Sequence, residues 1–130
     1  MEVIIDTHIF LWFINGDKKL KKTHKEIIEL KDNTIYLSVA SIWECVIKEQ
    51  IGKIKFPEKP SKYLSQKRML HQIESLDISE KTIYNIEGLP LLHKDPFDRI
   101  IIAQALENNY KILTEDKQIL DYKLPLFIFS

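Results

Sequence analysis

Short β-branched runs alternate with longer helical patterns along this chain of 130 residues. The runs are typical of buried strands, and the segments between them repeat apolar residues at helical spacing. Strands are predicted over residues 3–5, 34–37, 112–113 together with Tyr110, and 126–129, with a further short strand over 76–78. Helices are predicted over residues 20–30, 39–51, 61–73, 79–86 and 96–108. This alternation predicts an α/β fold with a parallel sheet, in a single domain covering residues 1–130.

Four isolated acidic residues, Asp6, Glu44, Asp98 and Asp116, stand just past these runs or on the helices that open from them. The carboxyl ends of parallel strands meet at one edge of a sheet, where ligands bind. Carboxylates gathered there at 4 Å would repel by roughly 4 kcal/mol per pair at an effective dielectric near 20. A divalent cation or a proton must therefore hold them together. Oxygen ligands without His or Cys companions suit Mg²⁺ or Mn²⁺ rather than zinc.

Each acid also has a structural explanation. Asp6 is well placed to cap a helix that begins after the first strand, and Asp116 to cap a short helix through residue 120. Glu44 can form a capping box with Ser41 or an ion pair with Lys48 one turn later. None of these explanations predicts that the acids converge. A sheet with the first two strands and the strand at 112–113 as neighbours predicts it directly.

The third acidic motif contains two acids, Asp95 and Asp98, at the start of the most apolar helix. Asp95 followed by Pro96 is a well-formed helix start, with Asp95 as the N-cap. Asp98 lies one turn into a helix that is otherwise nearly all buried, where an acid requires a partner. Arg99 points elsewhere on that helix. Either acid could face the ion, and Asp98 is favoured because the apolar helix continues from it in register.

Several side chains are expected to be core or rim residues. Glu115 is predicted to be exposed, both tryptophans and most phenylalanines to be core, and His8 and His93 to lie at the rim of the site. The helix over 39–51 is predicted to leave Ala40, Glu44 and Lys48 on a face near the strand end. Its buried face is predicted to consist of Val39, Trp43, Val46, Ile47 and Ile51.

Composition narrows the class of protein. The 19 Lys and Arg residues equal the 19 Asp and Glu residues, so net charge gives no general attraction to nucleic acid. Most lysines are expected on solvated helix faces, but the stretch from Lys48 to Arg68 is the best candidate for contacting a nucleic-acid backbone. A lone Cys45 excludes an intramolecular disulfide and fits a reducing compartment. With no signal peptide and no run of 18 apolar residues, a soluble cytoplasmic protein with no membrane partner is predicted.

Four motifs, in this order, closely resemble the PIN-domain family, and within it the VapC-type toxins of prokaryotic toxin-antitoxin pairs. They are Asp6-Thr7-His8, the segment from Ser38 to Glu44, the segment from His93 to Arg99, and the segment from Leu113 to Asp116. The resemblance covers essentially the whole chain, and the central Asp-Pro-Phe-Asp-Arg block is its most specific part.

The resemblance implies a Rossmann-like PIN domain with a mostly parallel sheet of four to five strands. It also implies a Mg²⁺- or Mn²⁺-dependent endoribonuclease that acts on RNA, is silenced by a small cognate antitoxin and commonly forms homodimers. By position, Asp6, Glu44 and Asp98 match the family's three core metal-site acids. Asp116 matches its more variable fourth acid, and Thr114 matches a hydroxyl beside the site.

Other readings of the acids stay open. In a phospho-receiver-like regulatory module, Asp6 and its neighbours would hold Mg²⁺ beside a phosphorylatable Asp. Such a module requires two adjacent acids at the end of the first strand and another acid at the end of a central strand. Here the second strand ends in Leu37 and Ser38 instead. A haloacid-type phosphatase would need an acid where His8 stands. A non-catalytic relative that retains the fold is a further reading.

Overall fold

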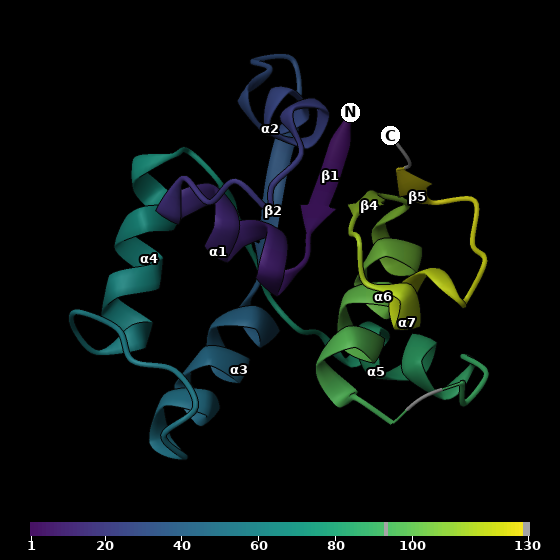
Figure 1. Cartoon of the computed structure of the whole chain (residues 1–130). Helices are drawn as coiled ribbons and strands as arrows, with labels where there is room; N and C mark the ends of the chain where they lie inside the picture. The colour runs from purple at the N-terminus through teal and green to yellow at the C-terminus, as the bar shows by residue number, and fades with distance from the viewer. Residues whose placement is uncertain (93, 129–130) are drawn as a thin grey trace.

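The computed structural model describes residues 1–92 and 94–128, and within them five strands form one parallel sheet (Figure 1). The order is β3-β2-β1-β4-β5, so β1 lies at the centre, and every pairing is parallel. The predicted parallel α/β fold is therefore confirmed. The strands are β1 Glu2–Ile5, β2 Thr34–Ser38, β3 Glu74–Leu76, β4 Lys111–Leu113 and β5 Phe127–Ile128.

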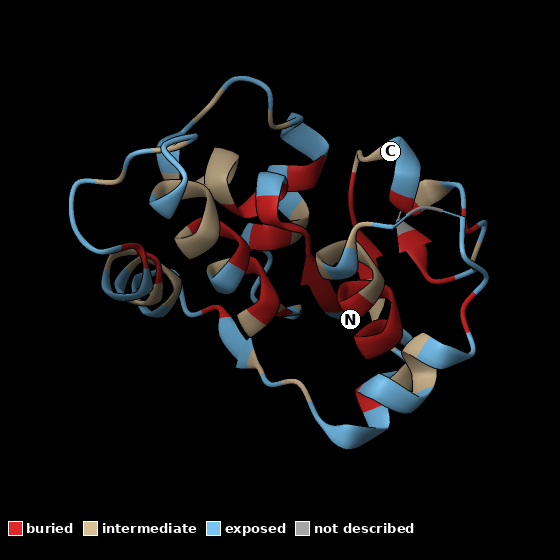
Figure 2. Ribbon diagram, turned by 90° about the horizontal axis from the view of Figure 1, so that it is seen from below, coloured by how far each residue is buried: buried red, intermediate tan, exposed pale blue. Residues whose placement is uncertain are grey.

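Helices cover both faces of the sheet, and the alternation within β1 explains why. Val3 and Ile5 belong to one apolar cluster with side chains of α1 to α4, whereas Ile4 belongs to a second cluster with α5, α6 and α7. Viewed onto the carboxyl ends of the strands, the buried residues form a band between the two layers (Figure 2). The helices are α1 Thr7–Asn15, α2 Lys22–Glu29, α3 Val39–Gln50, α4 Pro60–Leu70, α5 Glu80–Glu87, α6 Pro96–Asn108 and α7 Lys117–Leu120.

The predicted element boundaries hold best where caps define them. Helix α6 has the predicted bounds because Asp95 and Pro96 fix its start and Asn109 ends it in a left-handed conformation with φ of 56°. Helix α4 ends three residues before the predicted end, and Gln72 just beyond it has φ of 57°. The predicted strand over 76–78 lies instead at Glu74–Leu76. Phe129, the end of the predicted last strand, lies outside the described residues.

Helix α3 buries a different face from the predicted one. Its buried residues are Ala40, Ser41, Glu44 and Cys45, whereas Trp43 is 54% exposed and Ile51 60% exposed. The physical reason is that Glu44 accepts a hydrogen bond from the Thr7 hydroxyl in the interior of the protein, so the face of α3 that carries Glu44 is buried.

Every helix in the part of the chain that the structure describes is too short or too polar to reach across a membrane.

Candidate functional site

Asp6 lies at the carboxyl end of the central strand and holds two neighbouring segments. Its Oδ1 accepts a hydrogen bond of 2.8 Å from the backbone N–H of Ile9, which makes it the predicted N-cap of α1. Its Oδ2 accepts a hydrogen bond from the Thr114 hydroxyl. Thr114 follows β4, which pairs with β1 through Ile5 and Leu113, so parallel pairing alone brings the two side chains together. Burial raises the pKa of Asp6 to about 6.

Asp116 is linked to the same point through Thr114. Its backbone N–H donates to Thr114 Oγ1 at 3.0 Å, and its carboxylate accepts from the Gln118 N–H at 2.9 Å as the predicted cap of α7. Asp116 also contributes to the raised pKa of Asp6. The cap explanation is thus correct, and the side chain nevertheless lies beside the first acid.

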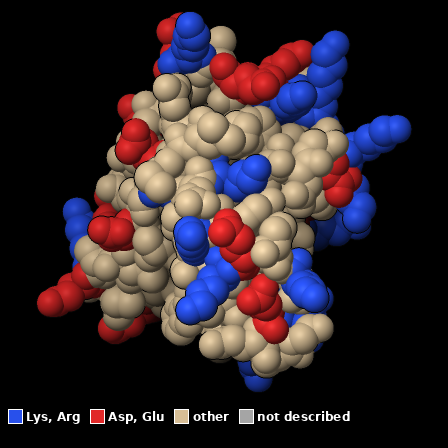
Figure 3. All heavy atoms as spheres, turned by 90° about the vertical axis from the view of Figure 1, so that its left-hand side faces the viewer, with Lys and Arg blue, Asp and Glu red and all other residues tan. Residues whose placement is uncertain are grey.

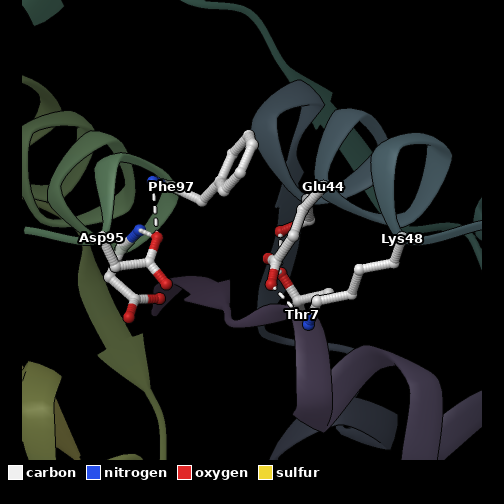
Figure 4. Close-up of polar contacts among 7 residues, drawn as sticks. Thr7, Glu44, Lys48, Asp95 and Phe97 are labelled. Atoms are coloured by element: carbon white, nitrogen blue, oxygen red, sulfur yellow. Dashed lines mark hydrogen bonds and ion pairs between the residues drawn. The ribbon is translucent and has the colours of Figure 1, made fainter. Parts of the chain in front are cut away.

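Glu44 reaches this edge of the sheet from α3 and is held from two sides. Its Oε1 accepts a hydrogen bond of 2.8 Å from the Thr7 hydroxyl, and its Oε2 lies 2.9 Å from Lys48 Nζ in the predicted ion pair (Figure 4). The predicted capping box between Ser41 and Glu44 is wrong. A capping box would need Ser41 as the N-cap, but α3 begins at Val39 with Ser38 as its N-cap. Ser41 Oγ instead lies 2.9 Å from Thr7 Oγ1.

The start of α6 is built as predicted. Asp95 Oδ1 accepts from the backbone N–H groups of Phe97 at 2.9 Å and of Asp98 at 3.4 Å, and Pro96 occupies the first turn. Figure 4 shows Asp95 and Glu44 projecting from α6 and α3 toward the space above the end of β1. Arg99 points away from the acids and donates to the backbone carbonyl of Pro90 at 2.9 Å.

The pKa of Asp98 indicates that several acids lie near one another. Its pKa rises from the ordinary 3.8 to about 8, first because the carboxyl is buried. Further contributions come from four carboxylates on separate segments, which are Asp95, Asp116, Glu44 and Asp6. Every acid that the sequence singled out therefore lies near enough to Asp98, at the carboxyl ends of the central strands, to influence its pKa.

The family is shown by sequence as well as by this architecture. Residues 3–124 match the PIN domain family. The chain belongs to the PIN-domain family. Ribonuclease VapC22 of Mycobacterium tuberculosis (strain ATCC 25618 / H37Rv) is 24% identical to it over 126 residues, which cover 95% of this chain and 93% of that protein.

Solved structures share the fold. One of them is the crystal structure of VapBC2 from Rickettsia felis bound to a DNA fragment from the VapBC2 promoter. It matches with a TM-score of 0.70 and 22% sequence identity, and the match covers 100% of this chain and 98% of that chain. A toxin-antitoxin complex from Klebsiella pneumoniae matches with a TM-score of 0.64 and 17% identity, over 98% and 96% of the two chains. VapBC-1 from nontypeable Haemophilus influenzae has the same TM-score and identity, over 98% and 97%.

The donor set of this PIN domain suits a hard divalent cation. Carboxylate and hydroxyl oxygens are the groups that face the site, which matches Mg²⁺ or Mn²⁺ better than zinc. Within residues 1–92 and 94–128, no group of three or more Asp, Glu, His or Cys side chains is arranged so that it could hold a metal ion.

Some residues of the site differ from the sequence expectations. Thr7, which donates a hydrogen bond to Glu44, had no predicted role. Its hydroxyl, directly after Asp6 at the start of a helix, was a feature of the sequence that could have indicated such a contact. Glu115, predicted to be exposed, is partly buried and pairs with Lys21 at 3.2 Å. His8 is exposed and lies in a pocket with Asp6, while His93 lies outside the described residues.

Replacing Lys48 with Met should lower the free energy of unfolding of the metal-free protein by about 1–2 kcal/mol. The substitution removes a cation whose side chain is 30% exposed from a carboxylate whose side chain is 10% exposed, and leaves Glu44 buried without its counter-charge. Lys62→Met is the matched control, because its ion pair with Glu58 is 3.6 Å long and exposed on both sides. That control should cost less than about 0.5 kcal/mol. Urea denaturation measures both, and equal losses would contradict the buried-pair argument.

Proposed function

We propose that this PIN domain is a Mg²⁺- or Mn²⁺-dependent endoribonuclease that hydrolyses RNA phosphodiester bonds. Asp6, Glu44 and Asp98 would hold the divalent ion directly or through water, and Asp116 would be a further ligand or would position water. The observation that carries the proposal is the pKa of Asp98, which carboxylates from four other points of the chain raise together with burial. Such an arrangement is costly to the fold unless a proton or a bound cation offsets the negative charge.

A bound divalent ion supplies charge that lowers the pKa of a coordinated water and offsets the charge of the phosphoryl group. The protein's own residues orient the ligands. Thr114 donates to one oxygen of Asp6 while the Ile9 N–H holds the other, which fixes the plane of that carboxylate. Thr7 and Lys48 fix Glu44 in the same way. Asp95 serves mainly as the cap that positions Asp98.

RNA is proposed as the substrate because the similar Mycobacterium protein is named a ribonuclease. The acidic centre itself repels a polyanion, so backbone contacts must come from nearby cations. Figure 3 shows the lysines of one face interspersed with acidic side chains rather than forming a continuous patch. Within the predicted stretch from Lys48 to Arg68, both end residues have other roles, since Lys48 pairs with Glu44 and Arg68 donates to the Ile73 carbonyl at 2.8 Å.

The exposed loop between α3 and α4 is therefore the part of that stretch best suited to the RNA backbone. Its cations are Lys53, Lys55 and Lys59, and all three line one pocket of the surface.

We further propose a cognate antitoxin as partner, a homodimeric state and a cytoplasmic location. The antitoxin is supported by the matched Klebsiella structure, which is described as a toxin-antitoxin complex. Co-expression with any short reading frame that adjoins the gene, followed by copurification, tests the antitoxin. Light scattering of the purified chain tests the homodimer.

The purified protein, free of any antitoxin, should cleave single-stranded RNA with Mg²⁺ or Mn²⁺ and lose that cleavage in EDTA. Cleavage should return when the metal is restored in excess, which separates metal loss from irreversible unfolding. Equal cleavage with metal and with EDTA would refute the metal-dependent mechanism. Absence of cleavage together with a stable aspartyl phosphate after incubation with a small phosphodonor would favour the receiver-like module instead.

A further inference from the structure

A pocket of about 190 Å³ opens directly beside the acids, and the proposed chemistry does not use most of its wall. It lies against the first two turns of α1 and the segment before α7. Its lining residues are Asp6, His8, Ile9, Trp12, Glu115 and Asp116. Two of the proposed metal-site acids thus form one side of the pocket, and apolar and aromatic groups form another.

The aromatic side of the pocket comes from residues four apart on α1. His8 and Trp12 lie on the same face of the helix, with ring centroids 6.0 Å apart and planes inclined at 43°. His8 is exposed, while Trp12 packs against the core and also lines the pocket. Ile9 is fully buried and adds an apolar surface. A flat heteroaromatic group can stack on one of these two rings and contact the other at an angle.

Three of the six residues that line the pocket are acidic, and one of these acids is paired with a cation. Glu115 at its rim is paired with Lys21 at 3.2 Å, so part of the negative charge on this side is neutralised by a cation that solvent and ligand can reach. A base seated against Trp12 would have its attached phosphate next to Asp6 and Asp116, where the proposed metal site lies.

We propose that this pocket receives an unstacked base of single-stranded RNA, next to the phosphodiester that is cleaved, with His8 and Trp12 as its stacking surface. The inference rests on the proposed nuclease function and extends it, because it makes an unpaired base part of substrate recognition. Enzymes that recognise single-stranded RNA commonly stack splayed bases on aromatic side chains. His8 and Trp12 are then binding residues, not groups that take part in the bond cleavage.

Fluorescence of Trp12 tests base binding without relying on activity. The chain has two tryptophans, so Trp43→Phe leaves Trp12 as the reporter, and adding Asp98→Asn prevents cleavage during the titration. A short single-stranded RNA should quench Trp12, whereas an abasic strand of the same length and charge should not. Adding His8→Ala should weaken the binding measured by quenching about tenfold. No quenching by the RNA, or equal quenching by the abasic strand, would overturn the inference.

Steady-state cleavage by the otherwise unchanged protein separates this inference from the nuclease proposal. His8→Ala should raise KM about tenfold with little change in kcat, while His71→Ala, which alters an exposed histidine that packs on Phe13 outside this pocket, should change neither. Cleavage by the wild-type protein with an unchanged KM in His8→Ala would reject the base pocket and retain the nuclease. Base-dependent quenching of Trp12 without any cleavage by the wild-type protein would reject the nuclease and retain the pocket.

Discussion

Asp98→Asn should reduce metal-dependent RNA cleavage by on the order of a hundredfold or more. The substitution preserves the size of the side chain but removes the carboxylate whose pKa is raised by burial and by the other four acids. Loss of partners that only orient metal ligands already costs about 10- to 100-fold, so loss of a ligand should cost at least as much. Single-turnover cleavage at saturating Mg²⁺ is the appropriate measurement, because it isolates the chemical step from product release.

Asp95→Asn is the matched control, because it makes the same chemical change three residues earlier. Asparagine caps helices about as well as aspartate, so the hydrogen bonds to the N–H groups of Phe97 and Asp98 should survive. Cleavage by this variant should stay within about threefold of the wild-type rate. If Asp95→Asn were instead the more damaging change, Asp95 would be the metal ligand and Asp98 its neighbour.

The free energy of unfolding of the Asp98→Asn protein distinguishes the loss of a functional acid from a folding defect. Because burial and four carboxylates oppose the ionised form of Asp98, its removal should leave the metal-free protein at least as stable as the wild type at pH 8. A variant that is inactive yet more resistant to urea has lost a functional acid. A variant that is inactive and less stable would not support the assignment.

Local signals in the sequence were sufficient to predict which strand ends and helix starts carry these acids. Asp6 and Thr114 follow short apolar runs, and parallel pairing of β1 with β4 in the register Ile5 to Leu113 brings the residues after those runs together. Asp95 with Pro96 fixed the start of α6, and through it the position of Asp98. These features depend on helix caps and strand ends. A small number of residues adjacent in the sequence is enough to determine each of them.

The buried face of α3 could not be predicted in this way. Hydrophobic periodicity assigns the apolar face to the core, but here the buried face carries Glu44, whose partner Thr7 is 37 residues away in the sequence. Trp43 instead packs edge-on against Phe97 of α6, with ring centroids 5.2 Å apart, and remains 54% exposed. A tertiary contact between polar groups outweighed the helical pattern, and no pattern within one helix reports such a contact.

Metal-free protein should become less stable as the pH rises from 6.5 to 9, by on the order of 2 kcal/mol in the free energy of unfolding. The pKa of Asp6 is about 6 and that of Asp98 about 8, both above the ordinary 3.8, so the folded protein holds these protons more tightly than the unfolded chain. Their contribution to stability is complete below about pH 4 and is lost as the pH passes first 6 and then 8. Urea denaturation in EDTA at the two pH values measures the change.

Saturating Mg²⁺ should reverse this trend, because divalent ions bind the ionised carboxylates and compete with protons for the same site. The stabilisation by Mg²⁺ should therefore be small at pH 6.5 and largest at pH 9, and proton release should accompany binding at pH 7. Asp98→Asn should flatten both the pH dependence in EDTA and the response to Mg²⁺, whereas Asp95→Asn, which removes only one of the carboxylates that raise the pKa of Asp98, should reduce them partly. A metal-free protein that gains stability toward pH 9, or an equal Mg²⁺ effect at both pH values, would show that Asp98 is not the proton- and metal-linked acid of this fold.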